Sequence, residues 1–133
     1  MDGVILTPLK IIHGTKGNVL HAMKASDSGY NGFGEAYFST VKYKEIKGWK
    51  RHNKMTLNLI VPQGEIEFIL HDGINHLKIS LSCENYQRLT VSPGLWMAFR
   101  GVGENLNLLL NIANIPHGPE EFNTKDLSEL NYE

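Results

Sequence analysis

The sequence predicts one all-β domain, either a sandwich or a barrel. Turn-forming residues recur about every eight to twelve residues, a spacing typical of those architectures. The apolar stretches between the turns are short, and none repeats with a sustained helical period. At 133 residues the chain is long enough to bury an ordinary core. Since we find neither an internal repeat nor a linker, we expect residues 1–133 to form a single domain.

The N-terminal part predicts short strands separated by turns. Pro8 cannot donate a backbone hydrogen bond, so it favours a sheet edge or a bend. Gly14-Thr15-Lys16-Gly17 predicts a turn, and residues 25–34, with three glycines, predict a flexible loop. The expected strands here are residues 4–6, 9–12, 19–23 and 35–41.

The centre of the predicted fold is a hairpin within residues 48–72. A basic group around His52 precedes an apolar strand at residues 56–61. Pro62-Gln63-Gly64 predicts a tight turn, and residues 65–71 alternate as a second strand. Cationic and titratable groups placed where paired strands begin indicate a small-molecule site.

The strongest strand signal follows this hairpin. Leu77, Ile79 and Leu81 share one face of residues 76–82, which is the period of two that a strand requires. Further strands are expected at residues 88–91, 95–99 and 106–112. Residues 124–131 are expected to form one short helix.

Charge and cysteine content exclude several classes of protein. The formal net charge is −1, so no overall basic field attracts nucleic acid or an anionic membrane. A single cysteine, Cys83, excludes an internal disulfide framework and a cysteine-rich zinc site. No apolar run is long enough to span a bilayer, and the N-terminus lacks the features of a signal peptide. We therefore expect a soluble cytoplasmic protein with neither nucleic acid nor membrane as partner.

Five short motifs resemble, in order and spacing, those of the dTDP-4-dehydrorhamnose 3,5-epimerase family over residues 3–121. They are Lys16-Gly17, Gly34-Glu35-Ala36-Tyr37-Phe38-Ser39, Gly48-Trp49-Lys50-Arg51-His52, Gly64-Glu65 and Pro93-Gly94. A weaker likeness is to the dTDP-sugar 3,4-ketoisomerases. The resemblance implies a cupin, which is a double-stranded β-helix or jelly-roll barrel. It also implies a homodimer that can exchange the N-terminal strands of residues 1–24, with residues 118–133 as a C-terminal tail.

The resemblance implies an isomerase that acts beside the keto group of a dTDP- or UDP-linked 4-keto-6-deoxy sugar, without a cofactor. Such enzymes serve deoxysugar and surface-polysaccharide biosynthesis. His52 falls on the position of the family's base, which removes a proton next to the ketone. Lys16 stands where the family directs an arginine towards the diphosphate. Glu35, Tyr37 and Arg51 fall on further positions of these substrate-binding motifs.

Some positions depart from the family's pattern. The lysine that steadies the enolate falls on Leu57, and the tyrosine that returns the proton falls on Asn111, which cannot titrate. The aspartate that orients the base is not expected in this shorter chain, and Glu120-Glu121 is interpreted as a solvated exit from the sheet. Two alternatives to an enzyme therefore stay open. One is a non-catalytic cupin that binds a nucleotide sugar, and the other is a structural or partner-binding β-barrel.

Asn58 and Asn111 are polar residues within apolar strands. One interpretation places both in a ligand cavity, and the other has the backbone satisfy their amides. A cupin metal site needs histidine and glutamate ligands where this chain has Lys54, Leu57 and Asn58, so we expect no metal. Trp96 is interpreted as a core residue in preference to a stacking platform for a nucleotide.

Overall fold

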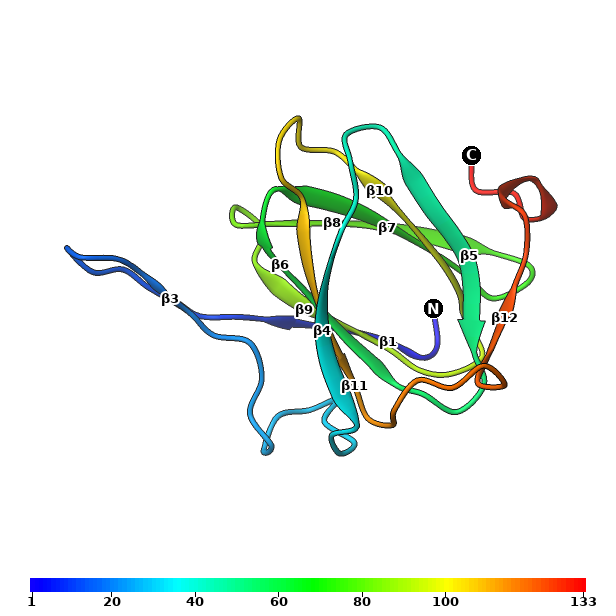
Figure 1. The fold of residues 1–133 in the computed structure, drawn as a ribbon, viewed down its shortest axis with the longest axis horizontal. Coiled ribbons are helices and arrows are strands. Elements are labelled where there is room, and N and C mark those ends of the chain that lie inside the picture. Colours follow the sequence, from blue (N-terminus) through cyan, green and yellow to red (C-terminus); the bar gives the residue numbers. More distant parts are fainter.

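The computed structural model describes residues 1–133 as two five-stranded antiparallel sheets packed face to face, which confirms the all-β jelly roll (Figure 1). The strand order is β1-β9-β6-β11-β4 in the first sheet and β12-β5-β10-β7-β8 in the second. The strands are β1 (Val4–Pro8), β2 (Ile11–Ile12), β3 (Val19–Leu20), β4 (Glu35–Thr40), β5 (Ile46–His52), β6 (Leu57–Gln63), β7 (Glu65–His71), β8 (His76–Ser82), β9 (Gln87–Val91), β10 (Trp96–Gly101), β11 (Leu108–Ala113) and β12 (Phe122–Thr124). No helix has the length and apolarity that a membrane crossing requires.

The main hydrophobic core fills the space between the sheets away from β4 and β5. Alternate residues of the central hairpin point into it, such as Leu59 on β6 and Phe68 on β7, both fully buried. Burial of one such side chain contributes about 1.5–3 kcal/mol. The predicted hairpin is confirmed, with Gly64 at its turn between β6 and β7. The core thereby leaves the space between β4 and β5 open for a site.

The predicted helix at residues 124–131 is wrong. Strand β12 pairs with β5, and only Leu127–Glu129 form a short 3-10 turn. Beyond the strand, Trp49 and Lys125 exchange two backbone hydrogen bonds of 3.1 Å, which holds the tail extended. The tail covers a second apolar cluster on the outer face of the second sheet. That cluster comprises Trp49, Ile69, Trp96 and Ala98, packed against Leu127, Leu130 and Tyr132.

Strand β5 is absent from the predicted elements because a β-bulge breaks its alternation. Lys50 pairs with Met97 and Lys47 pairs with Phe99, so two residues of β5, Gly48 and Trp49, lie opposite one residue of β10. Lys47 and Lys50 therefore share the inner face, although an odd spacing normally places side chains on opposite faces. The bulge requires Gly48, since an added Cβ would lie 2.5 Å from the Cβ of Ala98.

We expect Gly64→Ala to destabilise the protein more than Gly73→Ala. Both glycines have positive φ, +80° and +102°, a conformation that costs a non-glycine residue about 1 kcal/mol or more. The added Cβ of Gly64→Ala would also lie 2.3 Å from the carbonyl oxygen of Leu106, whereas Gly73 has open space around it. Urea denaturation measures both free energies of unfolding. Equal losses would contradict this account of the turn.

Candidate active site

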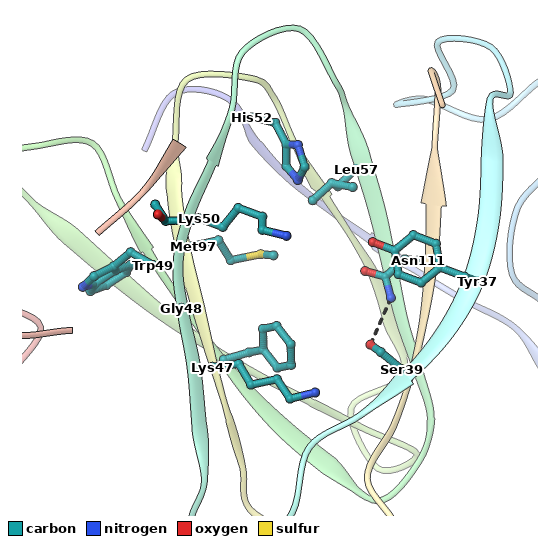
Figure 2. Close-up of a pocket in the computed structure, with 12 residues that line it drawn as sticks. Tyr37, Ser39, Lys47, Gly48, Trp49, Lys50, His52, Leu57, Met97 and Asn111 are labelled. Carbon is teal, nitrogen blue, oxygen red and sulfur yellow. Dashed lines mark hydrogen bonds between the residues drawn. The ribbon is translucent and has the colours of Figure 1, made fainter. Parts of the chain in front are cut away.

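A cavity of about 330 Å³ lies between the β4–β11 side of the first sheet and the β5–β10 side of the second (Figure 2). Both polar and apolar residues line its walls. It is lined by Tyr37, Ser39, Lys47, Gly48, Trp49, Lys50, His52, Leu57, Met97, Phe99, Asn111 and Thr124. Of the seven residues proposed for the site from the sequence, His52, Tyr37 and Asn111 line this cavity.

His52 closes one end of the cavity from the last position of β5 (Figure 2). The residue is only 9% exposed, and its Nδ1 is buried without a hydrogen-bond partner. That nitrogen lies 3.8 Å from Oε1 of Glu121, which is an electrostatic contact but too long for a hydrogen bond. The arrangement leaves Nε2 as the ring nitrogen available to a substrate.

Two expectations are wrong at Glu121. The residue is not a solvated exit from the sheet, and its carboxylate lies beside His52, where no carboxylate was expected. Its Oε1 accepts backbone hydrogen bonds from Asn53, Lys54 and Met55 at 3.0, 2.8 and 2.8 Å. Burial raises the pKa of Glu121, but these donors and nearby His52 lower it, with a net pKa below the ordinary 4.5. The turn after β5 thus wraps around the carboxylate and holds it beside the imidazole.

The surroundings of His52 favour a neutral imidazole. Burial of the ring lowers its pKa below 6.5, and the positive charge of Lys50 and the neighbouring His117 lower it further. Glu121 opposes them by raising the pKa. The His117 ring, stacked on Phe122, lies edge-on to His52 at a centroid distance of 6.4 Å. A neutral imidazole with one accessible nitrogen is suited to accept a proton.

The wall facing His52 carries a phenol and an amide. Tyr37 on β4 pairs directly with Asn111 on β11, so both project from the same part of the first sheet (Figure 2). Nδ2 of Asn111 donates a hydrogen bond of 3.3 Å to Oγ of Ser39. Burial raises the pKa of the Tyr37 phenol, and so does the charge of Glu35. The phenol is therefore protonated at neutral pH and can donate.

Arg51 does not line the cavity, which corrects its expected place in the site. Because His52 points inward, its neighbour on β5 points to the outer face. The Arg51 guanidinium lies 4.8 Å from the centroid of the Trp96 ring and donates a hydrogen bond to Asn123. Trp96 is itself buried in the outer cluster, as the core interpretation predicted.

Asn58 also faces away from the cavity, because its neighbour Leu57 points inward. The Asn58 side chain donates to the carbonyl of Gly29, and its Oδ1 accepts from Arg88 and Thr90. The interpretation that places Asn58 in a ligand cavity is therefore wrong. These bonds hold the loop before β4 against the outer face of the first sheet.

Glu35 and Lys16 lie outside the cavity of their own chain. The Glu35 carboxylate accepts a hydrogen bond of 2.9 Å from the backbone N–H of His117. Lys16 is exposed in the turn between β2 and β3, a hairpin that projects away from the barrel at the left of Figure 1.

No group of three or more histidine, cysteine, aspartate or glutamate side chains in the chain could hold a metal ion.

The fold and the chain as a whole match solved structures of sugar-nucleotide enzymes. A dTDP-sugar isomerase from Desulfovibrio desulfuricans G20 is 32% identical, with a TM-score of 0.92 over 96% of this chain and 87% of that one. The chain belongs to the dTDP-sugar isomerases. This confirms the resemblance to sugar-nucleotide cupins. No family model matches the sequence, and no curated protein matches it.

Two solved structures of lower sequence identity share the fold of this chain. One is a mutant of the 3,4-ketoisomerase QdtA from Thermoanaerobacterium thermosaccharolyticum in complex with TDP-4-keto-6-deoxyglucose. It is 20% identical, with a TM-score of 0.80 over 92% of this chain and 87% of that one. The other is dTDP-4-dehydrorhamnose 3,5-epimerase from Sulfolobus tokodaii. It is 17% identical, with a TM-score of 0.86 over 99% of this chain and 82% of that one.

We expect Glu121→Ala to lower the free energy of unfolding by about 1–3 kcal/mol, because the N–H groups of Lys54 and the partly buried Met55 lose a charged acceptor, whereas the N–H of Asn53 keeps the backbone carbonyl of residue 121. Glu121→Gln keeps an acceptor oxygen and should lose less. Since the folded pKa of Glu121 lies below 4.5, the wild-type advantage exists above that pH and disappears as the pH falls through the lowered value. Urea denaturation between about pH 3 and about pH 7, a range that includes the ordinary pKa of 4.5, measures both effects. A pH-independent difference between wild type and Glu121→Gln would contradict the assignment.

Proposed function

We propose that this chain is an isomerase or epimerase that acts beside the keto group of a dTDP-linked 4-keto-6-deoxy sugar, with His52 as the base. One observation carries the proposal: the cavity brings the imidazole of His52 opposite the phenol of Tyr37 (Figure 2). Two groups that transfer protons from opposite sides are what a change of configuration beside a ketone requires. The proposal extends to a cytoplasmic role in deoxysugar and surface-polysaccharide biosynthesis.

The proton transfer begins at Nε2 of neutral His52, which takes the proton from the carbon beside the ketone. The electron pair of the broken C–H bond forms a carbon–carbon double bond, and the carbonyl π pair moves to oxygen to give an enolate. As the enolate collapses, the Tyr37 phenol gives its proton to carbon from the other side. The imidazolium then loses its proton and the tyrosinate regains one, so the enzyme returns to its starting state.

Which carbon receives the proton decides the reaction. Return to the same carbon from the opposite side inverts its configuration, which is a single epimerisation. Return to the former carbonyl carbon, with a proton shifting between the two oxygens, moves the ketone to the neighbouring carbon. Both outcomes need one base and one acid, which is the number of such groups we assign to the facing walls, His52 and Tyr37.

The substrate contacts we propose divide between two chains of a homodimer. Tyr37 and Asn111 contact the sugar within one barrel. Within the N-terminal residues 1–24, β1 stays paired with β9 of its own chain, and we propose that the β2–β3 hairpin carries Lys16 to the partner's cavity, where its ammonium meets the diphosphate. The projecting hairpin supports this arrangement, because Ile12 and Val19 on it are 43% and 56% exposed in the single chain.

A second candidate function is a cupin that binds the nucleotide sugar without turning it over. The observation that favours it is that Leu57 and Asn111 line the cavity at the positions where the resemblance places a lysine and a tyrosine. Exchange of substrate hydrogen with solvent separates the two candidates, because binding alone exchanges nothing. A structural barrel would show neither exchange nor stabilisation by TDP.

We expect the wild-type chain to incorporate deuterium from D2O into TDP-4-keto-6-deoxyglucose, and His52→Asn to slow this by a factor of about 10² or more. TDP should still raise the melting temperature of His52→Asn, since the nucleotide does not need the base. Because only neutral His52 accepts a proton and its pKa is lowered, kcat/KM should fall on acidification only below pH 6.5. Nuclear magnetic resonance follows the exchange. Unchanged exchange in His52→Asn would remove the imidazole from the mechanism.

We expect Tyr37→Phe to separate exchange from product formation. His52 can still remove the proton and return deuterium from the same side, so exchange into the substrate should persist. Formation of the epimerised or isomerised product should fall by a factor of about 10² or more, because the opposite wall has lost its acid. The two signals are measured in the same resonance experiment. Product formation at the wild-type rate would show that another group returns the proton.

A further inference from the structure

We infer that Lys50 is a further catalytic residue, whose ammonium stabilises the negative charge on the substrate oxygen while His52 removes the proton. The inference rests on the proposed function. It assigns to Lys50 the stabilisation of the enolate, which Leu57 cannot provide because its side chain carries no charge. Removal of a proton beside a ketone places a full charge on oxygen, and a preorganised cation or donor at that oxygen is a major source of catalysis. The walls of the cavity must therefore supply such a group.

The cavity offers two cations, Lys47 and Lys50, both from β5. Lys50 precedes His52 by two residues on the same face of the strand, so their backbones are about 6–7 Å apart. In Figure 2 the Lys50 side chain extends from β5 across the cavity towards Asn111 and Tyr37, below His52. A ketone held beside Nε2 of His52 is then within reach of the ammonium.

The ammonium of Lys50 is free to bind an anion, whereas that of Lys47 is engaged. Lys50 forms no salt bridge, and its only contact of note is with the Phe122 ring, at 4.4 Å from Nζ to the centroid. Lys47 donates a hydrogen bond of 2.6 Å to the carbonyl of Thr40. The charge of Lys50 is thus uncompensated in the free protein and complementary to an oxyanion in the cavity.

Phe122 explains why Lys50 keeps this position without a carboxylate partner. The negative face of an aromatic ring attracts a cation held above it. Phe122 in turn stacks on His117, with ring centroids 4.9 Å apart, and His117 lies edge-on to His52. Phe122 and His117 of the C-terminal segment therefore connect Lys50 to His52 through a continuous series of contacts.

The test compares Lys50→Met with Lys47→Met, and uses Lys42→Met, an exposed lysine outside the cavity, as the unchanged control. We expect Lys50→Met to lower kcat by a factor of about 10² to 10³, with KM changed by no more than about threefold. Deuterium exchange should fall in parallel, because the enolate itself is harder to form. This differs from Tyr37→Phe, in which exchange persists. Lys50→Arg should restore part of kcat.

The pH profile supplies a readout that a merely structural lysine would not move. His52 is faced by Lys50 from β5, by Glu121 and His117 from the C-terminal segment, and by Tyr37 from β4 across the cavity. Loss of the Lys50 charge removes one cause of the lowered His52 pKa, so the acid limb of kcat/KM should move to higher pH in Lys50→Met. Lys47→Met should leave that limb in place.

Three results would overturn the inference. Lys50→Met with wild-type kcat and a raised KM would make Lys50 a binding residue only. A loss of kcat in Lys47→Met but not in Lys50→Met would transfer the role to Lys47. A wild-type chain that binds TDP but exchanges no deuterium would remove the proposed function itself, an outcome distinct from the first two because no variant is involved.

Discussion

The bulge in β5 decides which side chains enter the cavity, because a regular strand sends successive residues to opposite faces. An extra residue at Gly48-Trp49 shifts the register against β10, so that Lys47, Lys50 and His52 all face inward. The same shift turns Trp49 outward, where it is buried under the C-terminal tail. A single irregularity thus places two lysines and His52, the base we propose, in the cavity and anchors the strand that carries them.

The C-terminal segment completes the site from outside the barrel. Its Glu121 carboxylate holds the turn after β5, and Phe122 and Asn123 then pair with the strand itself. Further along, the carbonyl of Leu127 accepts a hydrogen bond of 3.3 Å from the indole of Trp49. Strand β5 is therefore fixed between β10 on one side and β12 on the other. This rigidity matters because a proton-transfer base must keep its distance to the substrate carbon.

The sequence predicted the barrel and the central hairpin, because regular alternation and tight turns can be recognised locally. His52 was proposed from the family resemblance, and it lines the cavity. The sequence did not predict β5, whose charged residues and bulge hide the alternation. It also misplaced Arg51 and Asn58, since one residue of register moves a side chain to the other face. Glu121 was missed for a different reason. Its carboxylate accepts hydrogen bonds from the backbone N–H groups of Asn53–Met55. Since nearly every residue type has such an N–H group, the sequence does not indicate which ones bind the carboxylate.

In the mechanism we propose, a neighbour in space offsets each of the two departures from the epimerase pattern. Asn111 cannot titrate, but Tyr37 lies directly across from it on β4 and brings a phenol to the same part of the wall. Leu57 carries no charge, but Lys50 reaches the cavity from β5 on the side of His52. A barrel lined by several strands can supply an acid or a cation from more than one of them. The proposed chemistry therefore depends on which groups line the cavity, and a residue-by-residue comparison along the sequence does not show groups that reach it from other strands.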